Sequence, residues 1–279
     1  MTEILRYCAF SSDPAGGNPA GVVLDARELA EADMQRIAAE VGYSETAFLS
    51  ARSGGGFDVR YFSPLAEVSF CGHATIAAAV AHADRHGPGD LDFHTRAGRV
   101  RVAVDAQRTA TLVSVPPRVE PLAAEALDGI LSALHWRRDE LDPALPPAIG
   151  YAGAWHPVIA TASRDRLRRL DYDFDALAAL MRQAGWTTVA LVWREAPDLF
   201  HARNPFPPGG VIEDPATGAA AAALGAWLAA IDALPASRRV LIHQGTDMGR
   251  PSRLLVTVPL GSGAGIRVSG TAVETTGAG

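Results

Sequence analysis

Two alanine-rich segments, Ala74–Ala83 and Ala216–Ile231, constrain the fold of this chain more than any other feature. Small apolar side chains occur on nearly every side of both segments. A helix that lies on a protein surface would instead show a polar stripe. Each helix must therefore be surrounded by other parts of the chain. A curled, mostly antiparallel sheet around each central helix meets this need and predicts an α+β fold of two similar half-barrels that face each other.

A weak internal repeat supports two such halves. Phe62-x-Pro64 precedes the first helix and Phe206-x-Pro208 precedes the second, with spacings that differ by two residues, and the repeat matches Cys71 with Asp214. Short β-type runs separated by Gly, Pro and Asp turns fill much of both halves. The pair Pro116 and Pro117 is the best candidate for the boundary. It predicts an N-terminal half-barrel at 1–117 and a C-terminal half-barrel at 118–279, with packing of the last strands on the first half left open.

Charge and composition exclude several classes of function. The sequence contains no lysine, so a pyridoxal Schiff base and a P-loop are excluded, because both require the amine. The net charge of −6 and the short arginine clusters do not fit a nucleic-acid partner. No apolar run reaches the roughly 20 residues that cross a bilayer, and two cysteines form no disulfide framework. We therefore expect a cytoplasmic protein without nucleic-acid or membrane partners.

Three polar residues are candidates for chemistry. Glu45 stands alone between Gly42, which ends a helix, and an apolar strand; it is either a solvated loop carboxylate or, if shielded, a general acid and base. His73, at the start of the first central helix, either packs there or orients an anion bound by helix N–H groups. Asp214 fits equally well as an N-cap, with Pro215 at the first helical position, and as a catalytic group.

Metal and thiol chemistry have weaker support. His82 and His86 have the i, i+4 spacing of metal ligands, but no third ligand accompanies them, so we predict no metal site. Cys71 is a stronger candidate, because a helix N-terminus favours the reactive thiolate. A racemase with two thiols would need a second cysteine at the matching place, where the repeat puts Asp214 instead.

Five short blocks, in order along the chain, form a specific pattern. They are Gly17-Asn18-Pro19-Ala20-Gly21-Val22, Ser44-Glu45-Thr46-Ala47-Phe48, Phe70-Cys71-Gly72-His73-Ala74-Thr75, Glu213-Asp214-Pro215-Ala216-Thr217-Gly218, and Gln244-Gly245 followed by Met248-Gly249-Arg250-Pro251-Ser252. With these blocks the chain resembles the phenazine-biosynthesis isomerase family, often called PhzF-like, along its whole length.

The resemblance implies a fold similar to diaminopimelate epimerase, with the active site in a cleft between two half-barrels. In that family the glutamate of the Ser-Glu-Thr block removes a proton from carbon and returns it elsewhere on the substrate, a role that Glu45 inherits. His73 and Asp214 are carried over as substrate-orienting and proton-relay residues. The expected substrate-binding residues are Asn18, Gly72, Thr217, Gly218 and Ala219. We expect the N–H groups at the two helix starts to receive a carboxylate or a developing enolate.

One departure concerns the substrate. Family members commonly carry Ser where this chain has Ala219, which removes a hydroxyl that could touch substrate. We predict an isomerase without metal or organic cofactor that moves a proton on a small carboxylic acid, such as a dihydro-hydroxyanthranilate-like ring. A homodimer follows from the resemblance alone. The alternatives are an amino-acid racemase or epimerase that uses Cys71 as one base, and a non-catalytic protein that binds a small ligand.

Overall fold

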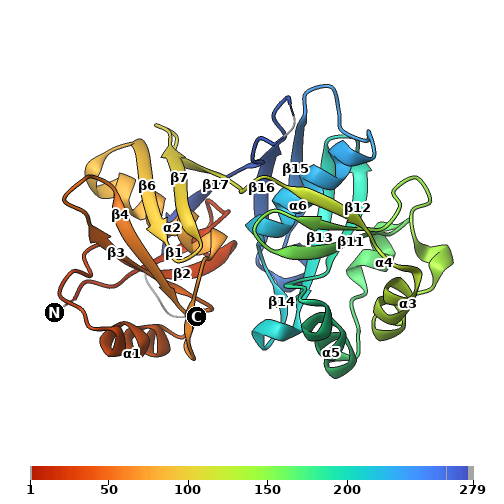
Figure 1. Cartoon of the computed structure of the whole chain (residues 1–279), viewed down its shortest axis with the longest axis horizontal. Helices are drawn as coiled ribbons and strands as arrows, with labels where there is room; N and C mark the ends of the chain where they lie inside the picture. The colour runs from red at the N-terminus through yellow and green to blue at the C-terminus, as the bar shows by residue number, and fades with distance from the viewer. Residues whose placement is uncertain (1, 262, 276–279) are drawn as a thin grey trace. The chain divides into compact units, whose positions relative to one another are not determined.

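The computed structural model describes residues 2–261 and 263–275. The chain forms two compact units, and each contains a mixed sheet with helices (Figure 1). Unit 1 consists of the chain up to Val113 together with the residues from Ser269 onward, and unit 2 consists of Ser114–Val268.

The elements of unit 1 are β1 (Leu5–Ala9), β2 (Asn18–Val23), α1 (Glu31–Val41), β3 (Thr46–Ala51), β4 (Phe57–Phe62), β5 (Glu67–Val68), α2 (Gly72–His86), β6 (Gly89–Thr95), β7 (Gly98–Val104), β8 (Thr109–Val113) and most of β17 (Arg267–Glu274). Those of unit 2 are β9 (Arg118–Pro121), α3 (Ala124–Ala133), η1 (Arg138–Glu140), β10 (Ala148–Tyr151), β11 (Trp155–Ala160), α4 (Arg164–Arg168), α5 (Phe174–Ala184), β12 (Ala190–Ala196), β13 (Leu199–Phe206), η2 (Pro207–Gly209), β14 (Val211–Asp214), α6 (Gly218–Ala230), β15 (Arg239–Gln244), η3 (Thr246–Met248) and β16 (Ser252–Thr257).

Strand pairing in unit 1 follows one continuous path. β1 pairs antiparallel with β2, β2 pairs parallel with β3, and β3 pairs antiparallel with β4. The path continues from β4 to the parallel strand β6 and then to the antiparallel strands β7 and β8. β17 pairs with both β8 and β1, so the strands close into a ring.

Helix α2 lies inside this ring (Figure 1). It contacts β1, β2, β3, β7 and β8, and its residues from His73 to Ala81 are all buried. Alanine dominates the buried part of the helix. Because these side chains are short, strands can approach the helix from several directions at once. The apolar pattern of the first alanine-rich segment therefore has the structural cause that the sequence indicates.

Unit 2 places α6 against its sheet in the same way. The sheet runs from β9 through β10, β11, β12, β13 and β15 to β16, and α6 contacts β9, β10, β11 and β16. A Cβ at Gly150 would lie 2.8 Å from the Cβ of Ala223, and a Cβ at Gly225 would lie 2.6 Å from Cγ1 of Val256. Helix and sheet are therefore closer than larger side chains would permit.

The two units share one topology. Unit 1 follows the order β1, β2, α1, β3, β4, β5, α2, β6, β7, and unit 2 follows the order β10, β11, α5, β12, β13, β14, α6, β15, β16, with α4 added before α5. Parallel pairs occur at equivalent places, β2 with β3 and β4 with β6 in unit 1, β11 with β12 and β13 with β15 in unit 2. The internal repeat seen in the sequence thus corresponds to a repeated order of elements.

Other helices cover the outer faces of the sheets with cores of their own. In unit 1, Met34 and Ile37 of α1 pack with Phe48 and Phe62 of the sheet. In unit 2, α3 and α5 contribute Leu127, Ile130, Leu131, Leu177 and Met181 to a cluster that includes Ile159 and Leu191 of the sheet. Part of each sheet is therefore packed between helices on both faces.

The central helices begin at other residues than the sequence predicts. α2 begins at Gly72 and ends at His86, so it is longer than the expected segment at both ends. α6 begins at Gly218 rather than Ala216. The reason is that Asp214 is the last residue of β14, and the residues after it connect strand to helix.

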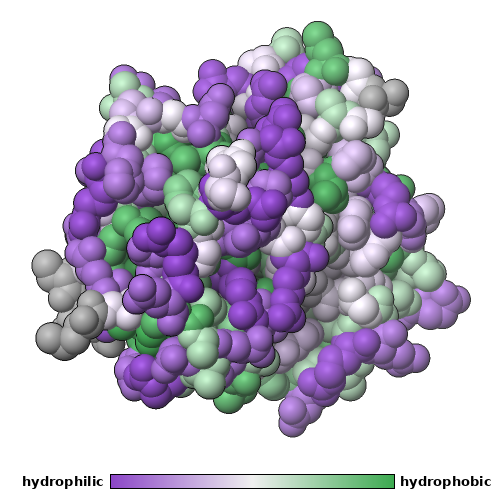
Figure 2. All heavy atoms as spheres, turned by 60° about the vertical axis from the view of Figure 1, so that its left-hand side comes forward, coloured by the Kyte–Doolittle hydropathy of each residue, from purple (hydrophilic) through white to green (hydrophobic). Residues whose placement is uncertain are grey.

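The surface mixes hydrophilic and hydrophobic side chains. In the view of Figure 2, hydrophilic residues cover most of the visible face and hydrophobic ones are interspersed among them. Leu65, Ile212 and Leu260 are the most exposed large hydrophobic residues of the described chain. In the part of the chain that the structure describes, no helix is both long enough and apolar enough to cross a membrane.

Candidate active site

Glu45 lies in unit 1 where a helix turns into a strand. α1 ends at Gly42, which adopts the left-handed conformation (φ 72°), and β3 begins at Thr46. The main-chain oxygen of Glu45 accepts a hydrogen bond from the N–H of Gly21, which fixes this loop to β2. The side chain of Glu45 is 16% exposed. It is therefore largely shielded from water rather than a freely solvated loop carboxylate.

His73 lies next to this carboxylate. It is the second residue of α2 and is buried. Its Nε2 lies 3.4 Å from Oε2 of Glu45 and 3.3 Å from Oγ of Ser44. Packing alone would not require a carboxylate and a hydroxyl at the same ring nitrogen. The geometry therefore brings Glu45 and His73 together as a pair that can exchange a proton.

Cys71 completes a group that we call the Glu45 cluster, defined as Glu45, Cys71 and His73. Cys71 is the N-cap residue of α2, and its Sγ lies 3.3 Å from Nδ1 and 3.8 Å from Nε2 of His73. One carboxylate oxygen, the sulfur and one ring nitrogen all lie within 4.8 Å of one another. Three groups that can each carry or release a proton thus converge at the start of α2.

Buried hydrogen bonds hold this helix start in place. Oγ1 of Thr75 donates to the main-chain oxygen of Cys71 at 2.6 Å, and the Tyr61 hydroxyl lies 2.6 Å from the same Oγ1. Burial raises the pKa of Tyr61 well above its ordinary value, so the phenol stays protonated and donates to Thr75. This chain of donors fixes the peptide that carries Cys71.

The first turn of α2 can also bind an anion. The helix ladder starts with the N–H of Thr75, which donates to the oxygen of Cys71. The N–H groups of Gly72, His73 and Ala74 precede that bond, so the ladder does not use them. Such groups carry the positive end of the helix dipole.

Asn18, another expected substrate-binding residue, is buried at the start of β2, where it pairs with Ala9 of β1.

Asp214 belongs to unit 2 and is half-buried. It is the last residue of β14, and its Oδ2 accepts a hydrogen bond from Oγ1 of Thr217 at 2.6 Å. The N-cap of α6 is Thr217, not Asp214, and Pro215 does not occupy the first helical position. The N-cap interpretation of Asp214 is therefore wrong, because the chain needs three more residues to pass from strand to helix.

Gln244 at the end of β15 joins this segment together. It is almost fully buried, and its Nε2 donates to the main-chain oxygen of Asp214 at 2.7 Å and to Oγ1 of Thr217 at 3.0 Å. Its Oε1 accepts the N–H of Thr217 at 3.1 Å. One of the N–H groups expected to receive substrate is thus already bonded, which leaves Gly218 and the residues after it for that task. Gln244 belongs to one of the five sequence blocks, but only the structure shows which groups it hydrogen-bonds.

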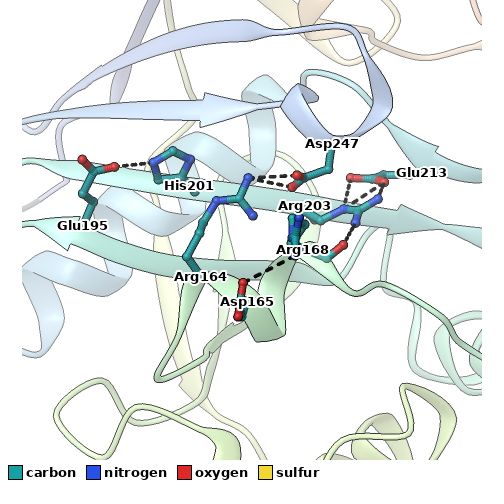
Figure 3. A network of polar contacts seen from close by, with 8 residues as sticks. All are labelled: Arg164, Asp165, Arg168, Glu195, His201, Arg203, Glu213 and Asp247. Carbon is teal, nitrogen blue, oxygen red and sulfur yellow. Dashed lines mark hydrogen bonds and ion pairs between the residues drawn. The ribbon is translucent and has the colours of Figure 1, made fainter.

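A buried ion pair supports the strand that carries Asp214. Nε of Arg203 donates to Oε1 of Glu213 at 3.0 Å, and Nη1 of Arg203 donates to the main-chain oxygen of Arg168 at 2.8 Å (Figure 3). Close by, Arg164 binds both carboxylate oxygens of Asp247 (Figure 3). Burial raises the pKa of Glu213, and Arg203 opposes that effect. The sequence showed none of these pairings.

The register between strands corrects the internal repeat. In unit 1 Tyr61 pairs with Val68, and in unit 2 Asn204 pairs with Asp214. The preceding residues match as well, because Arg60 binds Glu67 as Arg203 binds Glu213. The counterpart of Asp214 is therefore Val68, and Cys71 corresponds to Thr217, since both are N-cap residues. Ala219 is the second residue of α6, the position that His73 holds in α2.

Comparison with known proteins identifies the family. The family model for phenazine biosynthesis-like proteins matches residues 7–278. This chain belongs to that family. A protein of Escherichia coli K12 named "Uncharacterized isomerase YddE" is 35% identical over 283 residues, which cover 97% of this chain and 95% of that protein.

Two further members of the phenazine biosynthesis-like family show how widely the similarity extends. The trans-2,3-dihydro-3-hydroxyanthranilate isomerase of Pseudomonas fluorescens is 33% identical over 252 residues, 88% of this chain and 86% of that enzyme. The crystal structure of a PhzF-family phenazine biosynthesis protein of Bacillus anthracis has a TM-score of 0.86 at 26% identity and covers 98% of both chains. The resemblance, the isomerase class and the α+β fold with a mixed sheet are confirmed.

The histidine pair with metal-ligand spacing lies on a single helix of unit 1. His82 and His86 lie on α2 with ring centroids 4.5 Å apart, and burial lowers the pKa of His82. Among the residues that the structure describes, the one group of three potential metal ligands is the Glu45 cluster. The sequence did not indicate this group, because its members come from two different elements.

Proposed function

We propose that this member of the phenazine biosynthesis-like family isomerises a small carboxylic acid by moving a proton, with Glu45 as the proton carrier and without a cofactor. The observation that carries the proposal is the contact of 3.4 Å between Oε2 of Glu45 and Nε2 of His73, at the first turn of α2. The favoured substrate is a ring similar to dihydro-hydroxyanthranilate, because a relative 33% identical is named as the isomerase of that compound.

The reaction needs a base, an acid and a site for negative charge. The carboxylate of Glu45 accepts the proton from a C–H bond next to the acid group, and the bonding electrons move to an enolate oxygen. The N–H groups at the start of α2 stabilise that charge. Protonated Glu45 then delivers the proton to another carbon of the same substrate. His73 orients the carboxyl group of Glu45 through its Nε2.

The remaining family positions take supporting roles in the proposal. Asp214 serves as the second polar group of the reaction, with its carboxylate fixed by Thr217. Asn18 and the start of α6, with Gly218 and Ala219, bind the acid group. At the level of fold, we propose that each unit is a half-barrel of the diaminopimelate epimerase type around its central helix.

Deuterium exchange tests the proposal directly. The protein is incubated in heavy water with a panel of small carboxylic acids that includes the dihydro-hydroxyanthranilate ring, and carbon-bound deuterium is measured by mass spectrometry. Glu45→Gln keeps the shape and removes the base, so exchange should fall at least about 100-fold. Glu40→Gln, an exposed position on α1, is the matched control. Undiminished exchange by Glu45→Gln overturns the role, and binding without exchange would favour a non-catalytic protein.

A second candidate, an amino-acid racemase or epimerase, is favoured by one contact. Sγ of Cys71 lies 3.3 Å from Nδ1 of His73 and within 4.8 Å of the Glu45 carboxylate, so the thiol could act as a base at the same place. Cys71→Ser tests it, with Cys8→Ser as the control at the other cysteine. Loss of exchange at the α-carbon of an amino acid in Cys71→Ser alone would support the racemase, and full activity would exclude it.

Assembly and location stay proposals. We expect a homodimer, and light scattering after gel filtration measures its mass. We also expect a cytoplasmic location; Cys8 and Cys71 are both buried and neither is part of a disulfide, which fits a reducing compartment. Fractionation of cells that express the protein tests the location.

A further inference from the structure

We propose that the Glu45 cluster binds one Zn²⁺ ion and that this ion reversibly blocks the enzyme. The donor set is a thiolate, an imidazole nitrogen and a carboxylate oxygen, which are the three ligand types that zinc takes in proteins. A site with three protein ligands and one open position is the arrangement of exchangeable zinc sites. The blocking effect rests on the function proposed above, whereas the binding itself does not.

The donor atoms lie within 4.8 Å of one another, and the separation of nitrogen from oxygen matches that of a zinc tetrahedron. With metal–ligand bonds of about 2.0–2.3 Å, tetrahedral coordination separates nitrogen from oxygen by about 3.4 Å and nitrogen from sulfur by about 3.6 Å. Nε2 of His73 lies 3.4 Å from Oε2 of Glu45 and 3.8 Å from Sγ of Cys71. The sulfur lies nearer to Nδ1, at 3.3 Å, so the Cys71 side chain must turn toward Nε2 to complete the site.

The surroundings favour zinc over other common cations. Two of the three donors are anionic when the metal is bound, so the cluster balances the charge of a divalent ion. Cys71 and His73 are buried and the Glu45 side chain is 16% exposed, which leaves the carboxylate as the accessible edge. Mg²⁺ and Ca²⁺ prefer oxygen ligands, of which the cluster supplies one carboxylate. Ser44 or water completes the fourth position.

Zinc binding has a defined chemical consequence. The S–H bond of Cys71 breaks, the sulfur keeps the electron pair as it bonds to the metal, and the proton leaves to solvent. The same ion occupies the Glu45 carboxylate and Nε2 of His73. Neither group can then accept or position a substrate proton, so exchange stops until a chelator removes the ion.

Binding is tested first without any substrate. The untagged, chelator-treated full chain is titrated with Co²⁺, which reports a tetrahedral site by its visible bands and a thiolate ligand by a charge-transfer band in the near ultraviolet. One equivalent of Zn²⁺ should displace the Co²⁺. Cys71→Ser should lose the charge-transfer band and bind Zn²⁺ at least about 100-fold more weakly. Cys8→Ser, the other cysteine, and His86→Ala, in the histidine pair on α2, should bind as the unaltered protein does.

Several outcomes would overturn the zinc site. They are the absence of a thiolate band, a band that persists in Cys71→Ser, or binding that His86→Ala abolishes. Should Cys71→Ser fail to fold, Glu45→Gln provides the second variant, because its partly exposed side chain contributes little to the core and its loss removes the carboxylate ligand. If the protein binds Zn²⁺ but catalyses no deuterium exchange on any acid, the isomerase proposal is refuted and the zinc site is not. If it catalyses exchange that Zn²⁺ does not inhibit, the zinc proposal is refuted and the isomerase is not.

Discussion

Replacement of Gln244 by methionine gives the sharpest test of how unit 2 holds Asp214. The buried amide of Gln244 makes hydrogen bonds to the N–H and Oγ1 of Thr217 and to the main-chain oxygen of Asp214. Methionine has nearly the same length as glutamine but is apolar. Gln244→Met therefore removes the three bonds with little change in volume.

The magnitude follows from the groups left without a partner. An unpaired main-chain group in the interior costs about 1–3 kcal/mol. Two such groups, the N–H of Thr217 and the main-chain oxygen of Asp214, lose their hydrogen bond to Gln244. Both residues are half-buried, so water recovers part of the loss. We expect the free energy of unfolding to fall by about 2–4 kcal/mol, which corresponds to roughly 4–16 °C in Tm. Gln244→Glu keeps an acceptor for the N–H of Thr217 but buries an unpaired carboxylate against the main-chain oxygen of Asp214, so it should cost at least as much.

Urea denaturation and thermal melts measure this change, and Gln107→Met, at an exposed turn, is the control, with an expected effect within about 0.5 kcal/mol. Deuterium exchange should fall in Gln244→Met even under conditions where the variant is fully folded, because Asp214 and Thr217 are no longer held. A loss of stability below about 1 kcal/mol would refute the reasoning. It would mean that other contacts position this segment.

Two further predictions concern buried charge in unit 2. His156 is fully buried, and burial lowers its pKa to about 4 from 6.5. The neutral form therefore stabilises the fold above pH 6.5, and this contribution, roughly 3 kcal/mol, is lost as the pH falls toward 4. The stability of His156→Gln should depend less steeply on pH over that interval, and an identical slope would contradict the assignment. Arg203→Met leaves Glu213 buried without its partner and should lower the free energy of unfolding by about 3–5 kcal/mol. Adding Glu213→Gln to this variant should restore part of the lost stability. Chemical denaturation measures the single and double variants, and equal stabilities would show that the pair is not coupled.

The sequence by itself determined the two central helices. Their alanine-rich composition without a polar stripe requires a surrounding sheet, and α2 and α6 both contact strands on several sides. The helix starts were misplaced by two residues because composition marks an apolar stretch but not the point where the backbone leaves the extended conformation. Cys71 and Thr217 are still extended at that point.

Part of the candidate site also followed from sequence. Glu45, His73 and Asp214 could be named because they lie in recognisable blocks and because two of the blocks open apolar helices. The distance between Glu45 and His73 could not be derived. It depends on the pairing of β2 with β3, which places the loop after α1, and on the buried bonds that fix the start of α2.

Only the tertiary structure decided which residues share a hydrogen-bond network or a donor cluster. The repeat in the sequence matched Cys71 with Asp214, whereas strand register matches Asp214 with Val68. In the same way, the interactions of Gln244 with Asp214 and of Arg203 with Glu213 join different strands. The physical reason is that a local pattern records which face of an element is buried, while distances between side chains of different elements depend on pairing and packing that the pattern does not encode.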